Sequence, residues 1–262
     1  MWEFCIKVKK ENLEIAKFIY NTLKSETREL GAVITCYEEF DLVCIMIGCE
    51  RYNEDRVEII IERTIIKVIC TQFKDSYISK YLNLPNQDKI GLMAFKKALL
   101  NFDRETDYYL ISKNLSFNNN LYLESFFDFR LKEIREKWSE LVCLANENRD
   151  YLVSHEAFFD LLKFLIDNLE IGESEINVVE DEEGYKILDT SFETLIKEKQ
   201  YYDNEDLISS LIDLSPKKIN LYCKNENNVI KLLEKIFDDR IDIMFPNELK
   251  HFDNINVISK NF

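Results

Sequence analysis

Glycine, proline and histidine are scarce in this sequence. Its 262 residues include five glycines, three prolines and two histidines. Because glycine and proline interrupt regular structure, their scarcity excludes a flexible or low-complexity chain and predicts regular elements joined by short links. The glycines are also isolated from one another, so the sequence has no glycine-rich loop of the kind that holds phosphates or dinucleotides.

Basic residues are too few to balance the acidic ones. The chain has 34 Lys and Arg against 49 Asp and Glu, which gives a formal net charge of −15. An acidic surface of this kind repels the phosphate backbone of nucleic acids and the headgroups of anionic lipids. We therefore expect no nucleic-acid partner and no membrane partner. The expected partner is an unknown protein, and the oligomeric state stays open.

Signals for export or membrane insertion are missing as well. The first residues, MWEFCIKVKKENLE, do not place a basic stretch before an apolar core, as a secretory signal does. The longest apolar run, residues 42–49, is far shorter than the roughly 20 residues of a membrane-spanning helix. Seven cysteines are scattered along the chain without the dense spacing of a disulfide framework. These features predict a cytoplasmic protein with reduced thiols.

What the sequence does have is an uninterrupted segment in its middle, residues 121–146, that contains neither glycine nor proline. Apolar side chains recur in it at alternating steps of four and three, which is the spacing of one helix face: Phe127, Leu131, Ile134, Trp138, Leu141 and Ala145. Two large aromatic rings in this stripe indicate burial. The pattern predicts one long helix, on which the two ends of the chain assemble.

The hydrophobic periods predict an α/β fold, with α+β as the alternative. Residues 1–84 are expected to form a small βαββα unit whose second hairpin strand, residues 42–49, is apolar on both faces and therefore central. Asn12 is expected to cap the first helix and Gly31 to end it. Residues 85–170 are expected to form a helical middle layer in which Ser154 caps the last helix.

Residues 171–262 are expected to form a C-terminal α/β unit. Two β-rich runs flank the acidic turn at residues 181–184, which predicts a hairpin. Residues 192–199 fit a third strand or a short helix equally well. A strand at residues 218–223, a helix and a strand at residues 240–245 predict a crossover between two parallel strands.

The histidines and cysteines predict no catalytic or metal centre. His155 and His251 have no serine or cysteine in a recognisable nucleophile setting beside them. Cys44 and Cys49 are the nearest pair of thiols, but they face opposite sides of a regular strand and are expected to be core residues. We therefore predict no catalytic residue, no cofactor and no metal ligand. The acidic clusters at residues 181–183 and 203–206 are expected to be a hairpin tip and a helix start.

Arg130 is the residue that most invites a functional interpretation. It follows Phe126, Phe127 and Phe129 beside the predicted apolar stripe. A guanidinium next to a core commonly pairs with a buried carboxylate or binds helix carbonyls, and this structural role is the one we favour. The alternative role is to receive an anionic ligand. Arg135 and Arg240 are further guanidinium groups near predicted helices.

Three patches together resemble the YtxC-like sporulation protein family. They are SFFDFRLKEIREKW at residues 125–138, EINVVEDEEGYKILD at residues 175–189, and the pair LISSLIDLSPKKINLYCKN and VIKLLEKIFDDRIDIMF in residues 207–245. The resemblance covers roughly the second half of the chain. It implies an endospore-forming bacterium and a role linked to sporulation, and it carries no biochemical activity with it.

The expected function is that of a sporulation-associated cytosolic protein with a non-enzymatic role in protein interaction or structure. The motifs fall on packing positions and none of them assembles a reactive centre. The alternative is an enzyme that acts on a phosphorylated or nucleotide substrate through carboxylates and Arg130.

Overall fold

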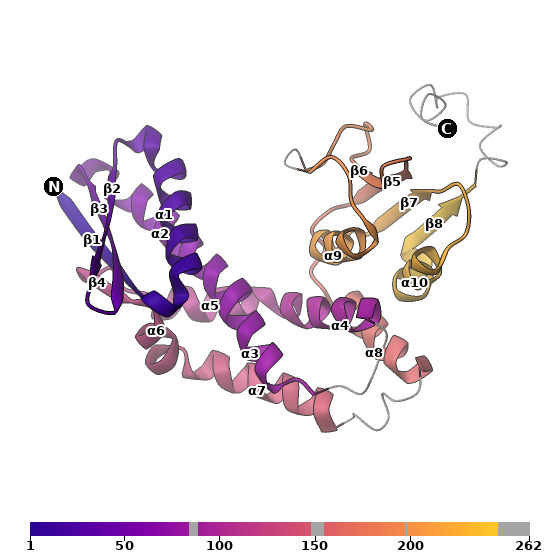
Figure 1. Ribbon diagram of the computed structural model, residues 1–262, viewed down its shortest axis with the longest axis horizontal. Helices are drawn as coiled ribbons and strands as arrows, with labels where there is room; N and C mark the ends of the chain where they lie inside the picture. The colour runs from indigo at the N-terminus through magenta and orange to yellow at the C-terminus, as the bar shows by residue number, and fades with distance from the viewer. Residues whose placement is uncertain (84–88, 148–154, 197–198, 246–262) are drawn as a thin grey trace. The chain divides into compact units, whose positions relative to one another are not determined.

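The computed structural model describes residues 1–83, 89–147, 155–196 and 199–245. The chain forms two compact units, shown in Figure 1. The N-terminal unit consists of Met1–Leu82 and Arg104–Ala145, and the C-terminal unit consists of Asn83–Asp103 and Asn146–Phe262. Each unit contains a four-stranded mixed sheet with helices, so the predicted α/β class is confirmed.

The N-terminal unit contains a sheet in the order β2-β3-β1-β4. β3 pairs antiparallel with β1 and β2, and β4 pairs parallel with β1. The predicted βαββα start and the inner position of the strand at residues 42–49 are therefore confirmed. The elements are β1 (Trp2–Lys9), α1 (Leu13–Glu26), β2 (Val33–Glu39), β3 (Leu42–Cys49), α2 (Glu54–Val68), α3 (Lys74–Tyr81), α5 (Arg104–Asn114), β4 (Asn120–Tyr122), α6 (Leu123–Ser125) and α7 (Lys132–Glu147).

Alternation along β1 and β3 builds the core of this unit. Phe4, Ile6 and Val8 alternate along β1 and are buried, and Ile6 stands directly opposite Ile45 of β3. α1 and α2 contribute to the same core with Ile19 and Ile61, which are also fully buried. Isoleucine is a mediocre helix former, so burial of this apolar face, and not intrinsic propensity, stabilises α2.

The C-terminal unit contains a sheet in the order β6-β5-β7-β8. β5 pairs antiparallel with β6, and β7 pairs parallel with both β5 and β8. The predicted hairpin and the predicted parallel strand–helix–strand unit are confirmed. Figure 1 shows α9 and α10 over one face of the sheet, with α4 and α8 packed on them. The elements are α4 (Lys89–Asn101), α8 (His155–Asp167), β5 (Glu175–Glu180), β6 (Tyr185–Leu188), α9 (Asn204–Leu214), β7 (Lys218–Tyr222), α10 (Asn228–Phe237) and β8 (Ile241–Met244).

The predicted single helix at residues 121–146 is wrong. The segment begins as β4, continues through α6 and a π-helix at Phe126–Arg130, and becomes regular α-helix only at Lys132. Its first residues are held in the sheet, because Leu121 pairs with Ile6 and the Cys5 amide donates to the Asn119 carbonyl at 2.9 Å. The predicted burial of the apolar stripe is confirmed for Trp138, which is completely buried.

Residues 104–114 form the helix α5. Two smaller predictions differ from the structure. In residues 192–196 and at residue 199 there is no strand or helix, only a single bridge between Leu188 and Thr194. Asn12 does precede α1, but its side chain does not cap that helix and instead donates to Glu124 Oε1 at 2.7 Å. The predicted cap at Ser154 lies outside the described residues.

The helical middle layer expected at residues 85–170 is divided between the two compact units, since α4 and α8 belong to the C-terminal unit and α5 to the N-terminal one. The division of the chain at residues 84 and 170 into parts that fold on their own stays a prediction.

Candidate binding groove

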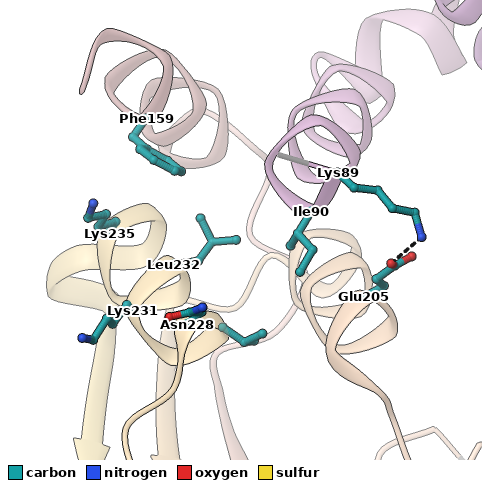
Figure 2. A pocket seen from close by; sticks show the side chains of 9 residues that line it. Lys89, Ile90, Phe159, Glu205, Asn228, Lys231, Leu232 and Lys235 are labelled. Carbon is teal, nitrogen blue, oxygen red and sulfur yellow. Dashed lines mark hydrogen bonds and ion pairs between the residues drawn. The ribbon is translucent and has the colours of Figure 1, made fainter. Parts of the chain in front are cut away.

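A groove of about 590 Å³ opens on the C-terminal unit at α4, α8, α9 and α10 (Figure 2). Its volume lies within the range of pockets that hold ligands or anchoring side chains. Nine residues line it: Lys89, Ile90, Phe159, Glu205, Asn228, Val229, Lys231, Leu232 and Lys235.

The floor of the groove is apolar. Figure 2 shows Ile90 from α4, Phe159 from α8 and Leu232 from α10 pointing toward a common space. Val229 and Leu232 are largely buried, so the floor is continuous with the packing between the helices. A large apolar side chain that enters the groove would therefore exchange water for apolar contacts on several sides.

The start of α10 is fixed by its own capping residue. Asn227 Oδ1 accepts hydrogen bonds from the Val229 and Ile230 amides at 2.9 and 3.0 Å. This cap satisfies amides of the first turn, which have no partner within a helix. Because Lys231 and Lys235 are four residues apart in this helix, they lie one turn apart on the same exposed face.

The rim of the groove carries more positive than negative charge. Three lysines and one glutamate line it, on a chain whose net charge is −15. Lys89 Nζ lies 2.6 Å from Glu205 Oε1, and this hydrogen bond raises the pKa of Lys89 above its usual value. Figure 2 shows that pair on one side of the space and Lys231 and Lys235 on the other.

The two lysines of α10 are the charges that remain available to a ligand. Lys231 is 3.6 Å from Glu226 in an exposed pair, which contributes little binding energy. Lys235 Nζ lies 5.0 Å from the centre of the Phe159 ring and has no carboxylate partner among the described residues. The groove thus combines an apolar floor with two exposed ammonium groups, an arrangement suited to an apolar side chain flanked by carboxylates.

Arg130 does not have the structural role that the sequence suggested. It ends the π-helix at Phe126–Arg130, it is exposed, and within the described part of the chain it makes no ion pair or side-chain hydrogen bond. It belongs to the N-terminal unit and does not line the groove. The enzymatic alternative built on Arg130 and carboxylates stays a prediction.

Arg135 and Arg240, unlike Arg130, do bind main-chain carbonyl groups. Arg240 Nε donates to the Pro216 carbonyl at 3.0 Å, and its Nη1 donates to the Ile166 carbonyl near the end of α8 at 3.2 Å. Arg135 donates to the Asp128 carbonyl in the π-helix. Both guanidinium groups therefore bind main-chain carbonyl oxygens within the last turn of a helix or just beyond its end.

The acidic clusters have the local roles that were expected of them. Asp181 lies at the hairpin tip between β5 and β6, where Lys186 Nζ and the Glu182 amide both donate to its carboxylate at 2.6 Å. Asp203 caps α9 by accepting from the Asp206 amide at 2.8 Å. The cluster at residues 181–183 does not line the groove, whereas Glu205 of the second cluster lies on its rim and pairs with Lys89.

Within the described ranges, no group of three or more His, Cys, Asp or Glu side chains is placed to hold a metal ion. Cys44 and Cys49 are both buried, as predicted, and alternate register places them on opposite faces of β3. His155 is the first residue of α8, and its side chain lies outside the described residues. His251 also lies outside them.

A buried ion cluster in the N-terminal unit escaped the sequence analysis. Asp107 of α5 is completely buried and accepts from Lys74 Nζ and Lys137 Nζ, each at 2.8 Å. Trp138 Nε1 donates to the same carboxylate at 3.1 Å. Burial lowers the pKa of Lys74, although the charge of Asp107 opposes that shift. Burial also raises the pKa of the nearby Cys70 thiol to about 12, so this sulfur stays protonated.

Two π-helices adjoin this cluster. One, Ile69–Phe73, leads directly into Lys74, and the other, Phe126–Arg130, leads into α7 with its Trp138. Phe73 and Phe127 from these two segments are in contact, with ring centres 4.9 Å apart. Because Lys74 and Asp107 are both closed to solvent, the cluster positions helices and does not present a reactive group to a ligand.

The fold and the groove together define an α/β protein with two mixed sheets and a lysine-rimmed groove on one unit. The chain belongs to the YtxC-like family, whose model matches residues 57–242. The match begins within α2, so it extends further toward the N-terminus than the resemblance seen in the second half of the sequence. No curated protein and no solved structure matches the chain. Within the described residues, no helix has the length and apolar character needed to cross a membrane.

Proposed function

We propose that this chain is a cytosolic, sporulation-associated protein that acts without enzymatic activity by binding a protein partner in the groove of its C-terminal unit. The observation that carries the proposal is the charge of the rim. On a chain with a net charge of −15, three lysines gather around an apolar floor. Family membership supports the link to sporulation through the resemblance described above.

The groove has the features that protein interfaces use to fix a partner. An apolar anchor in a desolvated pocket supplies most of the affinity of such interfaces, and charges at the rim guide the approach and reject wrong partners. Here the floor supplies the pocket and Lys231 and Lys235 supply the rim charges. The lysines of the groove attract an acidic partner segment. The net charge of −15 on the chain as a whole repels the same segment elsewhere on the surface.

Reversing the rim charge tests the proposal. We expect the double variant Lys231→Glu and Lys235→Glu, expressed in the native spore-forming host, to lower the yield of heat-resistant spores at unchanged protein level and melting temperature. Both side chains are exposed, so the fold does not depend on them.

The matched control is Lys217→Glu with Lys218→Glu, which makes the same charge change on two exposed residues at the start of β7 that do not line the groove. Spore yield should stay at the wild-type level in the control. If the groove variant and the control produced equal spore yields, the proposal would be wrong.

A further inference from the structure

The turn between β2 and β3 presents an apolar side chain to solvent. Phe40 is 93% exposed, the highest value among the large hydrophobic residues of the described chain. Its backbone lies in the left-handed region, at φ 52°. A bulky residue seldom adopts this conformation, which asparagine or glycine accommodates far more easily. Neither the exposure nor the backbone conformation of Phe40 contributes to the folding of the N-terminal unit.

Phe40 is flanked in the sequence by acidic residues. Residues 38–41, which we name the Phe40 tip, read Glu-Glu-Phe-Asp. Glu38 pairs with Lys10 at 2.7 Å and Glu39 with Lys7 at 3.5 Å, whereas Asp41 has no ion-pair partner among the described residues. The tip is held rigidly, because its strands pair over their whole length and the Lys10 amide donates to the Asp41 carbonyl at 2.8 Å.

The Phe40 tip and the groove have complementary chemistry. The tip offers one large apolar ring beside acidic side chains, and the groove offers an apolar floor beside Lys231 and Lys235. We propose, on the basis of the proposed function, that the occupant of the groove is the Phe40 tip of a second copy of this chain. The Phe40 ring packs against Ile90, Phe159 and Leu232, and the carboxylate of Asp41 binds the ammonium groups of α10.

A second copy is the occupant that the structure itself supplies. Each molecule carries one tip and one groove, and the two surfaces differ, so the contact is head-to-tail. Contacts of this kind leave a tip and a groove free at the ends and continue into a ring or an open chain of molecules. Insertion also accounts for the exposed Phe40, because its ring is buried only after assembly.

Two variants remove the two halves of the contact without disturbing the fold. Phe40→Asn deletes the ring and places a residue that accepts positive φ, so its melting temperature should equal or exceed that of the wild type. Lys231→Glu with Lys235→Glu reverses the charge at the groove. Phe129→Asn is the matched control for the ring, since Phe129 is 79% exposed in the same unit but lies outside the tip.

Sedimentation analysis of the full-length chain over a range of concentrations tests the contact. The wild type and Phe129→Asn should gain mass as concentration rises, while Phe40→Asn and the double lysine variant should each remain monomeric. An equimolar mixture of these two monomeric variants should form dimers and nothing larger, because one supplies an intact groove and the other an intact tip. A wild type that is monomeric at every concentration, or a self-association that Phe40→Asn leaves unchanged, overturns the inference.

Spore yield separates this inference from the proposed function. If the occupant is the tip of another copy, Phe40→Asn should lower the yield as much as the double lysine variant does. A normal yield with Phe40→Asn and a low yield with the lysine variant would overturn the inference and leave the proposed function standing. Normal yields with both variants would overturn both.

Discussion

The two units of this protein use the same residue types in opposite ways. In the N-terminal unit, Lys74 is fully buried, directly follows a π-helix and is bound to Asp107. In the C-terminal unit, Lys235 is exposed and lies over an aromatic ring at the edge of a groove. A buried charge must be paired and specifies how helices fit together, whereas an exposed charge costs the fold little and is free to act on a partner. Charge therefore organises the interior of one unit and the surface of the other.

Removal of the buried carboxylate is the largest expected perturbation. Asp107→Ala leaves the ammonium group of Lys74 and the indole N–H of Trp138 without their shared acceptor in a closed site. Breaking a buried pair in this way should lower the free energy of unfolding by about 3–5 kcal/mol. Urea denaturation followed by circular dichroism measures it.

The control for that change is Lys235→Ala in the other unit, which should alter stability by less than about 0.5 kcal/mol, as surface substitutions commonly do. Equal effects of the two substitutions would abolish the contrast between interior and surface charge.

Alanine substitutions at two glycines compare the backbone constraints of the two units. Gly184 has φ 135°, and a Cβ placed there would lie 2.6 Å from the Tyr202 carbonyl oxygen. Gly31 has φ 64° and nothing within 4 Å of its Cβ position. Gly184→Ala should therefore cost about 2–3 kcal/mol, because it combines backbone strain with a clash, and Gly31→Ala about 1 kcal/mol for strain alone. Thermal unfolding should rank them in that order, and the reverse ranking would show that the β5–β6 turn relaxes freely.

The smallest effect is a pH dependence at the tip of the β5–β6 hairpin. The hydrogen bond from Lys186, followed by that from the Glu182 amide, lowers the pKa of Asp181 below 3.8, and the same pair raises the pKa of Lys186 above 10.5. The carboxylate contributes stability that is present above pH 3.8 and is lost as the pH falls through its folded value. The ammonium group contributes stability that is present below pH 10.5 and is lost as the pH rises through its folded value.

Asp181→Asn should remove both contributions, with a loss near neutral pH of about 1 kcal/mol, the upper end of the range for exposed ion pairs, because the two side chains are only 15% and 19% exposed. Unfolding measured from acid to alkaline pH should give a flatter profile for this variant than for the wild type. Glu182→Ala, an exposed neighbour in the same turn, serves as the control. A variant profile parallel to that of the wild type would contradict the assignment.

Local patterns predicted the sheets well. Alternation placed β1, the apolar run at residues 42–49 placed β3, and the Asp181–Gly184 turn with its flanking runs defined β5 and β6, because these signals depend on neighbouring residues. The strand at the start of this segment was missed because its cause is a distant contact, the pairing of β4 with β1. The break at Leu131 follows the π-helix at Phe126–Arg130. Helical spacing continues through that break, so periodicity alone could not reveal it.

The groove and the buried cluster depended on contacts between residues far apart in the chain. Lys74 and Asp107 have ordinary surface sequence patterns around them, and only packing brings them together. Lys231 and Lys235 showed the spacing of one helix face, which was a usable signal, but Ile90 and Phe159 come from distant helices. Phe40 stands among three acidic residues between two β-rich runs, so a candidate binding tip was visible in the sequence itself.

A photo-crosslink from the floor of the groove tests the central claim most directly. A photoreactive phenylalanine analogue replaces Ile90 in an isotope-labelled copy, which is mixed with unlabelled wild-type chain and irradiated, and the adducts are digested and identified by mass spectrometry. The account predicts an adduct between the labelled peptide that contains position 90 and the unlabelled peptide that contains Phe40. An adduct with any other segment would contradict it. An adduct in which the Phe40 peptide always carries the isotope label would contradict it as well, because the contact would then lie within one molecule.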